Sequence, residues 1–122
     1  MSRAEADRLL TELTEMITSQ SFEGLDIEAY LDERDEPEFA DAWMRSFHIL
    51  GERAETDVEE VLRTYREKAF KQTFAYTGDA DLAGYVSDDI GLIGVYLLQD
   101  GFQDSFLEKL LEGYSQGRLP LR

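Results

Sequence analysis

The chain contains no cysteine and no asparagine, and it has one histidine among its 122 residues. Without cysteine, disulfide bonds, thiolate nucleophiles and thiolate metal ligands are excluded. The single histidine, His48, leaves no His-x-x-x-His or Glu-x-x-His pattern from which a zinc site is usually built. Without asparagine there is no acceptor for N-linked glycosylation. We therefore expect no metal site and no cofactor.

Long apolar runs and excess positive charge are also missing. The longest apolar stretch, from Ile90 to Leu98, is far shorter than the ~20 residues that a membrane-spanning helix needs. The first residues, Met1 to Arg8, lack the apolar core of a signal peptide. A net charge of −15 disfavours direct binding to nucleic acid or to an anionic membrane, because like charges repel. These absences predict a cytoplasmic protein, and they leave its oligomeric state open.

The negative charge is unevenly distributed. Residues 1–60 hold 18 acidic and 5 basic residues, whereas residues 61–122 hold 9 acidic and 7 basic residues. Charge that served only solubility or tolerance of salt would coat the whole surface. The length and a hydrophobic content of 43% favour one ordered domain over residues 1–122, with an acidic half and a near-neutral half.

Apolar residues recur at helical spacing along the chain, and no strand-like alternation with a tight turn is present. We predict helices over 4–18, 25–33, 37–51, 57–77, 79–100 and 104–115, which makes an all-α, compact single-domain bundle of four to six helices. Ser2 with Glu5, and Thr56 with Glu59, have the spacing of capping boxes. In the helix that ends at Gly78, Phe70 and Phe74 are expected to widen the buried stripe.

The segment from Phe22 to Asp41 carries nine carboxylates and a single arginine, which gives a formal charge of −8. Apolar residues are threaded through it, so it is not a solvated acidic tail. We predict an ordered acidic face that binds a basic protein, with aromatic anchors among its carboxylates. The predicted partner-binding residues are Asp26, Glu28, Tyr30, Asp32, Glu33, Asp35, Glu36, Glu38, Phe39, Asp41 and Trp43.

Several functions fit such a face. The favoured hypothesis is a non-enzymatic interaction module, for example a bacterial immunity protein or another inhibitor of a basic nuclease toxin, which the chain resembles in size, acidity and helical character. A DNA mimic that occupies a DNA-binding protein is an alternative. The near-neutral half 61–122 argues for a patch rather than a full mimic. A structural subunit whose acidic face is simply solvated is a further alternative.

A second candidate lies in the helix predicted over 79–100. Gly84, Ser87, Gly91 and Gly94 would line one narrow strip, which either packs closely against another helix or forms a ligand groove. Beside the strip, Asp88 and Asp89 could form a buried carboxylate pair that serves a small enzyme. Alternatively, Ser87 caps a helix after a kink and both carboxylates lie in its first turn.

One catalytic motif is matched by chance. Residues Gly113 to Gly117 read G-x-S-x-G, the nucleophile elbow of hydrolases. That motif requires a preceding strand and a later histidine, whereas a helix is predicted before it and His48 lies upstream. We therefore assign no catalytic residue and expect no enzyme.

Overall fold

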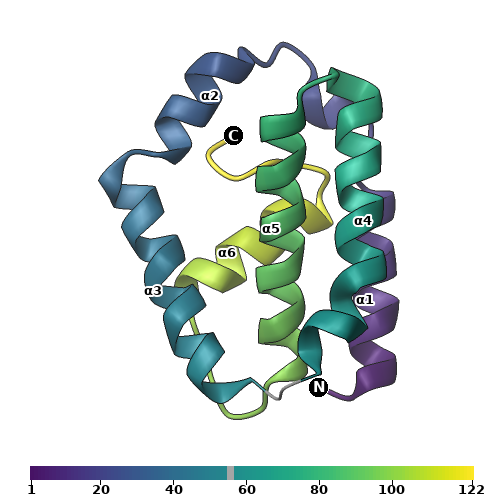
Figure 1. Ribbon diagram of the computed structural model, residues 1–122, viewed down its shortest axis with the longest axis vertical. Coiled ribbons are helices and arrows are strands. Elements are labelled where there is room, and N and C mark those ends of the chain that lie inside the picture. The colour runs from purple at the N-terminus through teal and green to yellow at the C-terminus, as the bar shows by residue number, and fades with distance from the viewer. Residues whose placement is uncertain (55–56) are drawn as a thin grey trace.

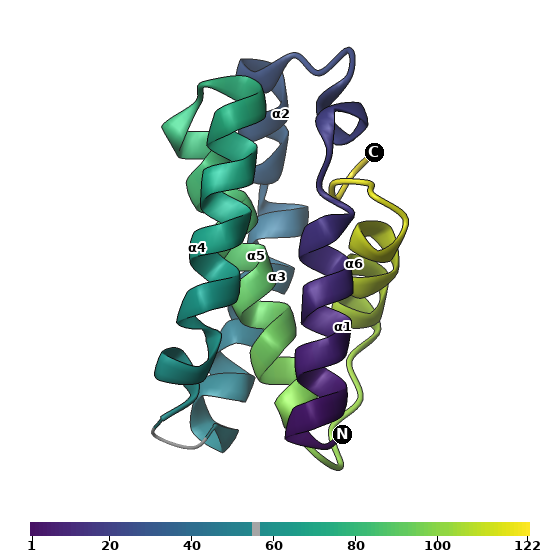
Figure 2. The same cartoon turned by 90° about the vertical axis from the view of Figure 1, so that its right-hand side faces the viewer.

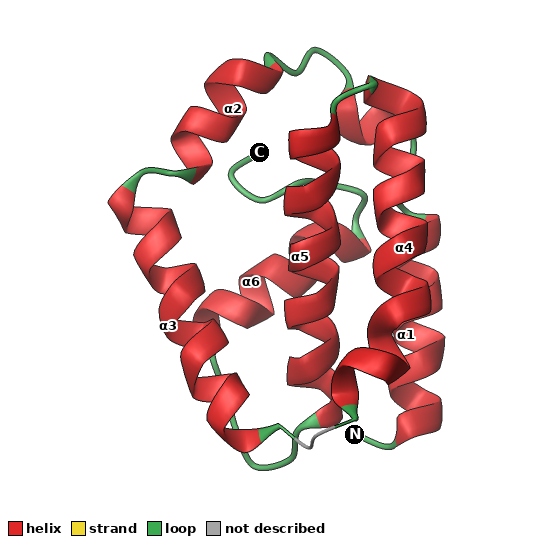
Figure 3. Cartoon of the chain, in the orientation of Figure 1, coloured by secondary structure: helices red, strands yellow, loops and turns green. Residues whose placement is uncertain are grey.

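A computed structural model describes residues 1–54 and 57–122. Within them the chain forms six α-helices and no strand (Figure 3). The helices are α1 (Arg3–Glu15), α2 (Ile27–Arg34), α3 (Pro37–Arg53), α4 (Val58–Thr77), α5 (Ala80–Leu98) and α6 (Ser105–Ser115), and a short 3-10 helix, η1 (Ser19–Phe22), precedes α2. The predicted all-α bundle is confirmed.

Polar residues define where most helices begin. Ser2 caps α1, and its hydroxyl accepts a hydrogen bond from the backbone N–H of Glu5. Asp26, Asp79 and Asp104 cap α2, α5 and α6 in the same way, each with a side-chain oxygen that satisfies an N–H of the first turn. The predicted capping box at Thr56 lies outside the described residues.

Helix α5 is the centre of the bundle. Its buried residues include Ala83, Leu92 and Ile93, which point to different sides of the helix. A helix that is apolar around most of its circumference is covered by neighbours on most sides. In two perpendicular views, α5 lies between α4 and α1 on one side and α3 on the other, while α6 crosses it (Figures 1 and 2).

Helices α4 and α5 pack closely because the residues of α5 at their contact are glycines and a serine, which have small side chains or none. A Cβ atom placed on Gly94 would lie 2.5 Å from the Cδ2 of Leu62. A Cβ on Gly91 would lie 2.9 Å from the Cδ of Arg66. Ser87 is buried beside them, and its hydroxyl donates a 3.1 Å hydrogen bond to the carbonyl of Arg66. Gly91, Gly94 and Ser87 therefore contact side chains or backbone of α4, which is consistent with the packing hypothesis.

The prediction for α4 was wrong at two positions. Phe70 and Phe74 stack on each other, with ring centroids 6.4 Å apart, on the exposed side of the helix rather than in the core. Their exposed fractions are 37% and 47%. The buried stripe is narrower than predicted and includes Leu62, Ala69 and Thr73.

Helices α2 and α3 form an arm that descends along one side of the bundle, with α3 standing apart from α4 (Figure 1). The last residues of the chain return to this arm, beside α2. The guanidinium of Arg122 donates hydrogen bonds to the carbonyls of Ser21 and Glu23, which precede α2. None of the helices in the described part of the chain is long and apolar enough to cross a membrane.

Two glycines of α5 allow a matched test of this packing. In Gly94→Ala the new methyl group would overlap Leu62, so we expect the free energy of unfolding to fall by about 1–3 kcal/mol. In Gly84→Ala the methyl group meets no atom within 4 Å, and the better helix propensity of alanine should raise that free energy by up to about 1 kcal/mol. Urea denaturation followed by circular dichroism measures both. Equal effects of the two variants would contradict the packing.

Candidate functional site

The nine carboxylates between Phe22 and Asp41 are all exposed to solvent. They extend from the turn before α2, along α2 and its connection to α3, into the first turns of α3. We call these side chains the acidic surface: Glu23, Asp26, Glu28, Asp32, Glu33, Asp35, Glu36, Glu38 and Asp41. The structure therefore brings the predicted carboxylates together on one arm of the molecule.

The one arginine of this segment, Arg34, points away from the acidic surface into the interior. Its side chain is 5% exposed and forms a two-pronged ion pair with Asp89 of α5, which is 0% exposed. The two nitrogen–oxygen distances are 2.8 Å and 3.0 Å. Because Arg34 is paired inside the protein, the segment itself contributes nine exposed carboxylates and no exposed base, while Lys109 of α6 lines the same cleft as Glu33 and Glu36.

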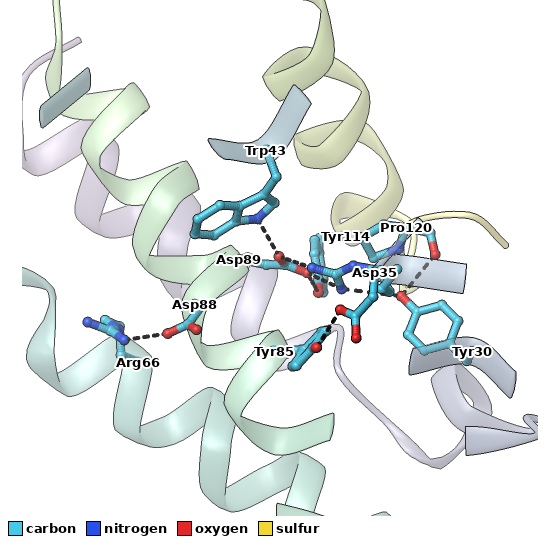
Figure 4. Close-up of polar contacts among 10 residues, drawn as sticks. Tyr30, Asp35, Trp43, Arg66, Tyr85, Asp88, Asp89, Tyr114 and Pro120 are labelled. Carbon is cyan, nitrogen blue, oxygen red and sulfur yellow. Dashed lines mark hydrogen bonds and ion pairs between the residues drawn. The ribbon is translucent and has the colours of Figure 1, made fainter. Parts of the chain in front are cut away.

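Asp89 collects hydrogen bonds from three other helices (Figure 4). Besides Arg34 of α2, the indole Nε1 of Trp43 in α3 donates to it at 3.0 Å. The hydroxyl of Tyr114 in α6 donates at 2.6 Å. All of these donors point at one buried carboxylate, so it joins α2, α3 and α6 to the central helix.

Burial shapes the proton equilibria of this network. Complete burial raises the pKa of Asp89, while the Arg34 guanidinium and the hydrogen bonds from Tyr114 and Trp43 act in the opposite direction. Burial and the neighbouring Asp89 charge hold the pKa of Tyr114 well above its usual range. Tyr114 therefore keeps its proton and remains a hydrogen-bond donor to Asp89.

Aromatic rings surround the Arg34 guanidinium. Its central carbon lies 4.6 Å from the ring centroid of Phe39 and 5.2 Å from that of Tyr85. Such contacts favour a cation that has been removed from water. The hydroxyl of Tyr85 donates a 2.6 Å hydrogen bond to Asp35, which also ties one residue of the acidic surface to α5.

The prediction of Tyr30 as an anchor for a partner is inconsistent with its position. Tyr30 is 4% exposed, and its hydroxyl donates a 2.9 Å hydrogen bond to the carbonyl of Pro120. Burial raises its pKa to about 12. Phe39 and Trp43 are half-buried, and both line open clefts beside α3.

The family model for immunity protein PIM1 matches residues 8–121. The chain belongs to the PIM1 family of immunity proteins. No curated protein matches the chain. An immunity protein acts by binding a partner toxin, so the family indicates a role in binding rather than in catalysis.

The predicted carboxylate pair of this immunity protein is not formed. Successive residues of a helix point about 100° apart, and α5 is continuous through both positions. Asp88 points outward, where it pairs with Arg66 at 2.7 Å with 54% of its side chain exposed. Asp89 points inward to Arg34. The alternative of a kink capped by Ser87 is also wrong, because Asp79 caps a single helix over Ala80–Leu98.

Gly84 and His48 make no contact in the described part of the chain that indicates a catalytic or ligand-binding role. Gly84, at one end of the predicted strip, would meet no neighbour with an added methyl group. His48 is exposed and lies edge-on to Phe47. In the described part of the chain, no group of three or more histidine, aspartate or glutamate side chains is arranged to hold a metal ion.

Sequence reasoning missed Arg34 and Tyr114 as members of the Asp89 network. One signal for Arg34 was present, because it is the only base among nine carboxylates and lies four residues after Tyr30, on the same face of α2. No comparable signal exists for Tyr114, whose helical spacing fits any core aromatic residue.

Asp88 and Asp89 allow a direct test of the network in the immunity protein. Asp89→Asn would leave the Arg34 charge buried without a counter-charge, so we expect the free energy of unfolding to fall by about 3–5 kcal/mol. Asp88→Asn removes only a surface ion pair and should cost less than about 1 kcal/mol. Urea titrations of both variants give the comparison. If Asp89→Asn were as stable as Asp88→Asn, the buried pair would not hold the arm in place.

Proposed function

We propose that the immunity protein neutralises a toxin by binding a basic surface of that toxin with its acidic surface. The exposure of all nine carboxylates, with Arg34 withdrawn from among them, carries the proposal. A surface of one charge sign attracts a partner of opposite sign over a distance of about a Debye length, which speeds and orients association.

The arrangement of the arm supports this role. The acidic surface lies mainly on α2 and α3, and Arg34 and Trp43 fix both helices to Asp89. Mutually repelling carboxylates would otherwise favour a looser arm. A surface held rigid before binding loses less conformational entropy when its partner docks.

The chemistry of the surface also favours one class of toxin. An enzyme that cleaves nucleic acid must present lysine and arginine side chains to the phosphate backbone. The acidic surface complements such a basic substrate-binding region, so a nuclease toxin is the partner class that we propose. Binding alone would then inactivate the toxin, and the immunity protein needs no catalytic residue of its own.

Charge reversal tests the proposal. Asp32, Glu33 and Glu36 are exposed on the acidic surface, and their joint replacement by lysine should slow association with the toxin at least tenfold at low salt. The difference from the unaltered protein should shrink as salt is added. Two criteria identify the toxin. The immobilised immunity protein captures it from an extract of the native cells, and the immunity protein relieves the growth inhibition that the captured protein causes. Stopped-flow or surface-binding measurements give the association rate.

A matched control separates position from net charge. Glu12, Glu15 and Glu112 are exposed on α1 and α6, and lysine at these three positions changes the net charge by the same amount. We expect the control to associate with the toxin nearly as fast as the unaltered protein. Equal slowing by both variants would mean that only overall charge matters, and the acidic surface would then have no specific role.

A further inference from the structure

A groove of about 710 Å³ runs between α3 and the packed pair of α4 and α5. Its floor is apolar and buried, with Leu50, Leu62 and Leu92 contributed by the three helices. Its volume lies within the range of pockets that hold the side chains of a bound molecule. Residues 1–54 and 57–122 leave this groove open.

The α3 wall of the groove leaves large apolar side chains in water. Met44 is 44% exposed and Phe47 is 48% exposed, and both line the groove. Phe47 stacks on Trp43 one helical turn earlier, with ring centroids 5.6 Å apart. Single exposed apolar residues are ordinary, whereas neighbouring ones that border an apolar groove are typical of an interaction site.

The groove is continuous with the acidic surface. A smaller cleft of about 200 Å³ is lined by Asp35 of the acidic surface, by Trp43 and Met44, and by Asp88. Trp43, Met44 and Asp88 also line the larger groove. A bound segment could therefore lie across both without leaving the protein surface, with its charged part beside Asp35 and its apolar part beside Phe47.

We infer that the groove receives aliphatic or aromatic side chains from a toxin segment whose lysine or arginine residues lie on the acidic surface. This inference rests on the proposed function, because the acidic surface supplies the charge complementarity that selects a basic segment. The two regions affect different rate constants of binding. The carboxylates speed and orient association, whereas burial of apolar side chains in the groove slows dissociation.

The charge of the chain favours this occupant over a second copy. Each copy carries a net charge of −15, so two copies repel each other, and the cleft that leads into the groove is bordered by Asp35 of the acidic surface. A basic segment with apolar side chains satisfies both the charged and the apolar part of the surface. Amphipathic segments commonly bind grooves between helices in this way.

Trp43 provides a fluorescence probe for binding in the groove, since it is the only tryptophan in the chain and lines the groove. The probe is a synthetic helical peptide with leucines on one face and lysines on the other. Binding should shift the Trp43 emission to shorter wavelength, because the peptide displaces water from the indole. Two control peptides, one with glutamate for lysine and one with serine for leucine, should leave the emission unchanged.

Exposed aromatic residues elsewhere provide a matched control for the groove. The double variant Met44→Ser, Phe47→Ser should weaken binding of the lysine–leucine peptide at least tenfold, the scale of losing central apolar contacts. The variant Phe70→Ser, Phe74→Ser removes comparably exposed apolar residues from α4 outside this groove and should bind like the unaltered protein. Circular dichroism verifies that both variants keep their helices.

Three results would overturn the inference. The first is no change in Trp43 emission with the lysine–leucine peptide, and the second is equal binding of the glutamate control peptide. The third is concentration-dependent self-association that Phe47→Ser abolishes, which would assign the groove to a second copy.

With the toxin itself, the two proposals fail separately. Groove variants should raise the dissociation rate, while lysine at Asp32, Glu33 and Glu36 should lower the association rate. If only the groove variants have no effect, the inference fails and the acidic surface stands.

Discussion

The buried ion pair between Arg34 and Asp89 is the interaction on which the position of the acidic surface depends. Removing two charges from water costs several kcal/mol for each ion, and only good geometry with further hydrogen bonds offsets that cost. Here the guanidinium binds the carboxylate through two nitrogens, and Trp43 and Tyr114 complete its hydrogen bonds. Helices in apolar contact can slide past each other at little cost. The hydrogen bonds of this network, in contrast, form in only one arrangement of α2, α3, α5 and α6.

The same pair separates the charges of the arm. Arg34 could have shielded its neighbours at the surface, but it faces inward and leaves nine carboxylates without a positive residue among them. Such a surface repels itself and is kept together by the apolar side of α2 and by the Asp89 network. A basic partner, as proposed, would relieve that repulsion on binding. The membership in the PIM1 family of immunity proteins fits a surface that is completed by another protein.

Much of the fold could be predicted from the sequence because it depends on local patterns. Helical spacing and the capping box that begins at Ser2 place the helices within a few residues of their bounds. Exposure of the carboxylates also follows from their charge. The partners of Arg34 could not be predicted, since Asp89 is 55 residues away and nothing local distinguishes it from Asp88. The sequence also could not predict that four apolar side chains are exposed, because periodicity shows an apolar face but not whether a neighbour covers it. These side chains are Phe70, Phe74, Met44 and Phe47.

The hydrogen bond from Tyr30 to the carbonyl of Pro120 has a consequence for the order of folding. It joins residues 90 positions apart, and Arg122 reaches back over 101 positions to Ser21. Contacts of such long range form late, because the chain must close a large loop before they are gained. Helices α4 and α5, which are adjacent in the chain, can pair earlier, but the arm has its full set of contacts only when residues 120–122 are present. A nascent chain would therefore be helical well before it could hold its acidic surface in its final position.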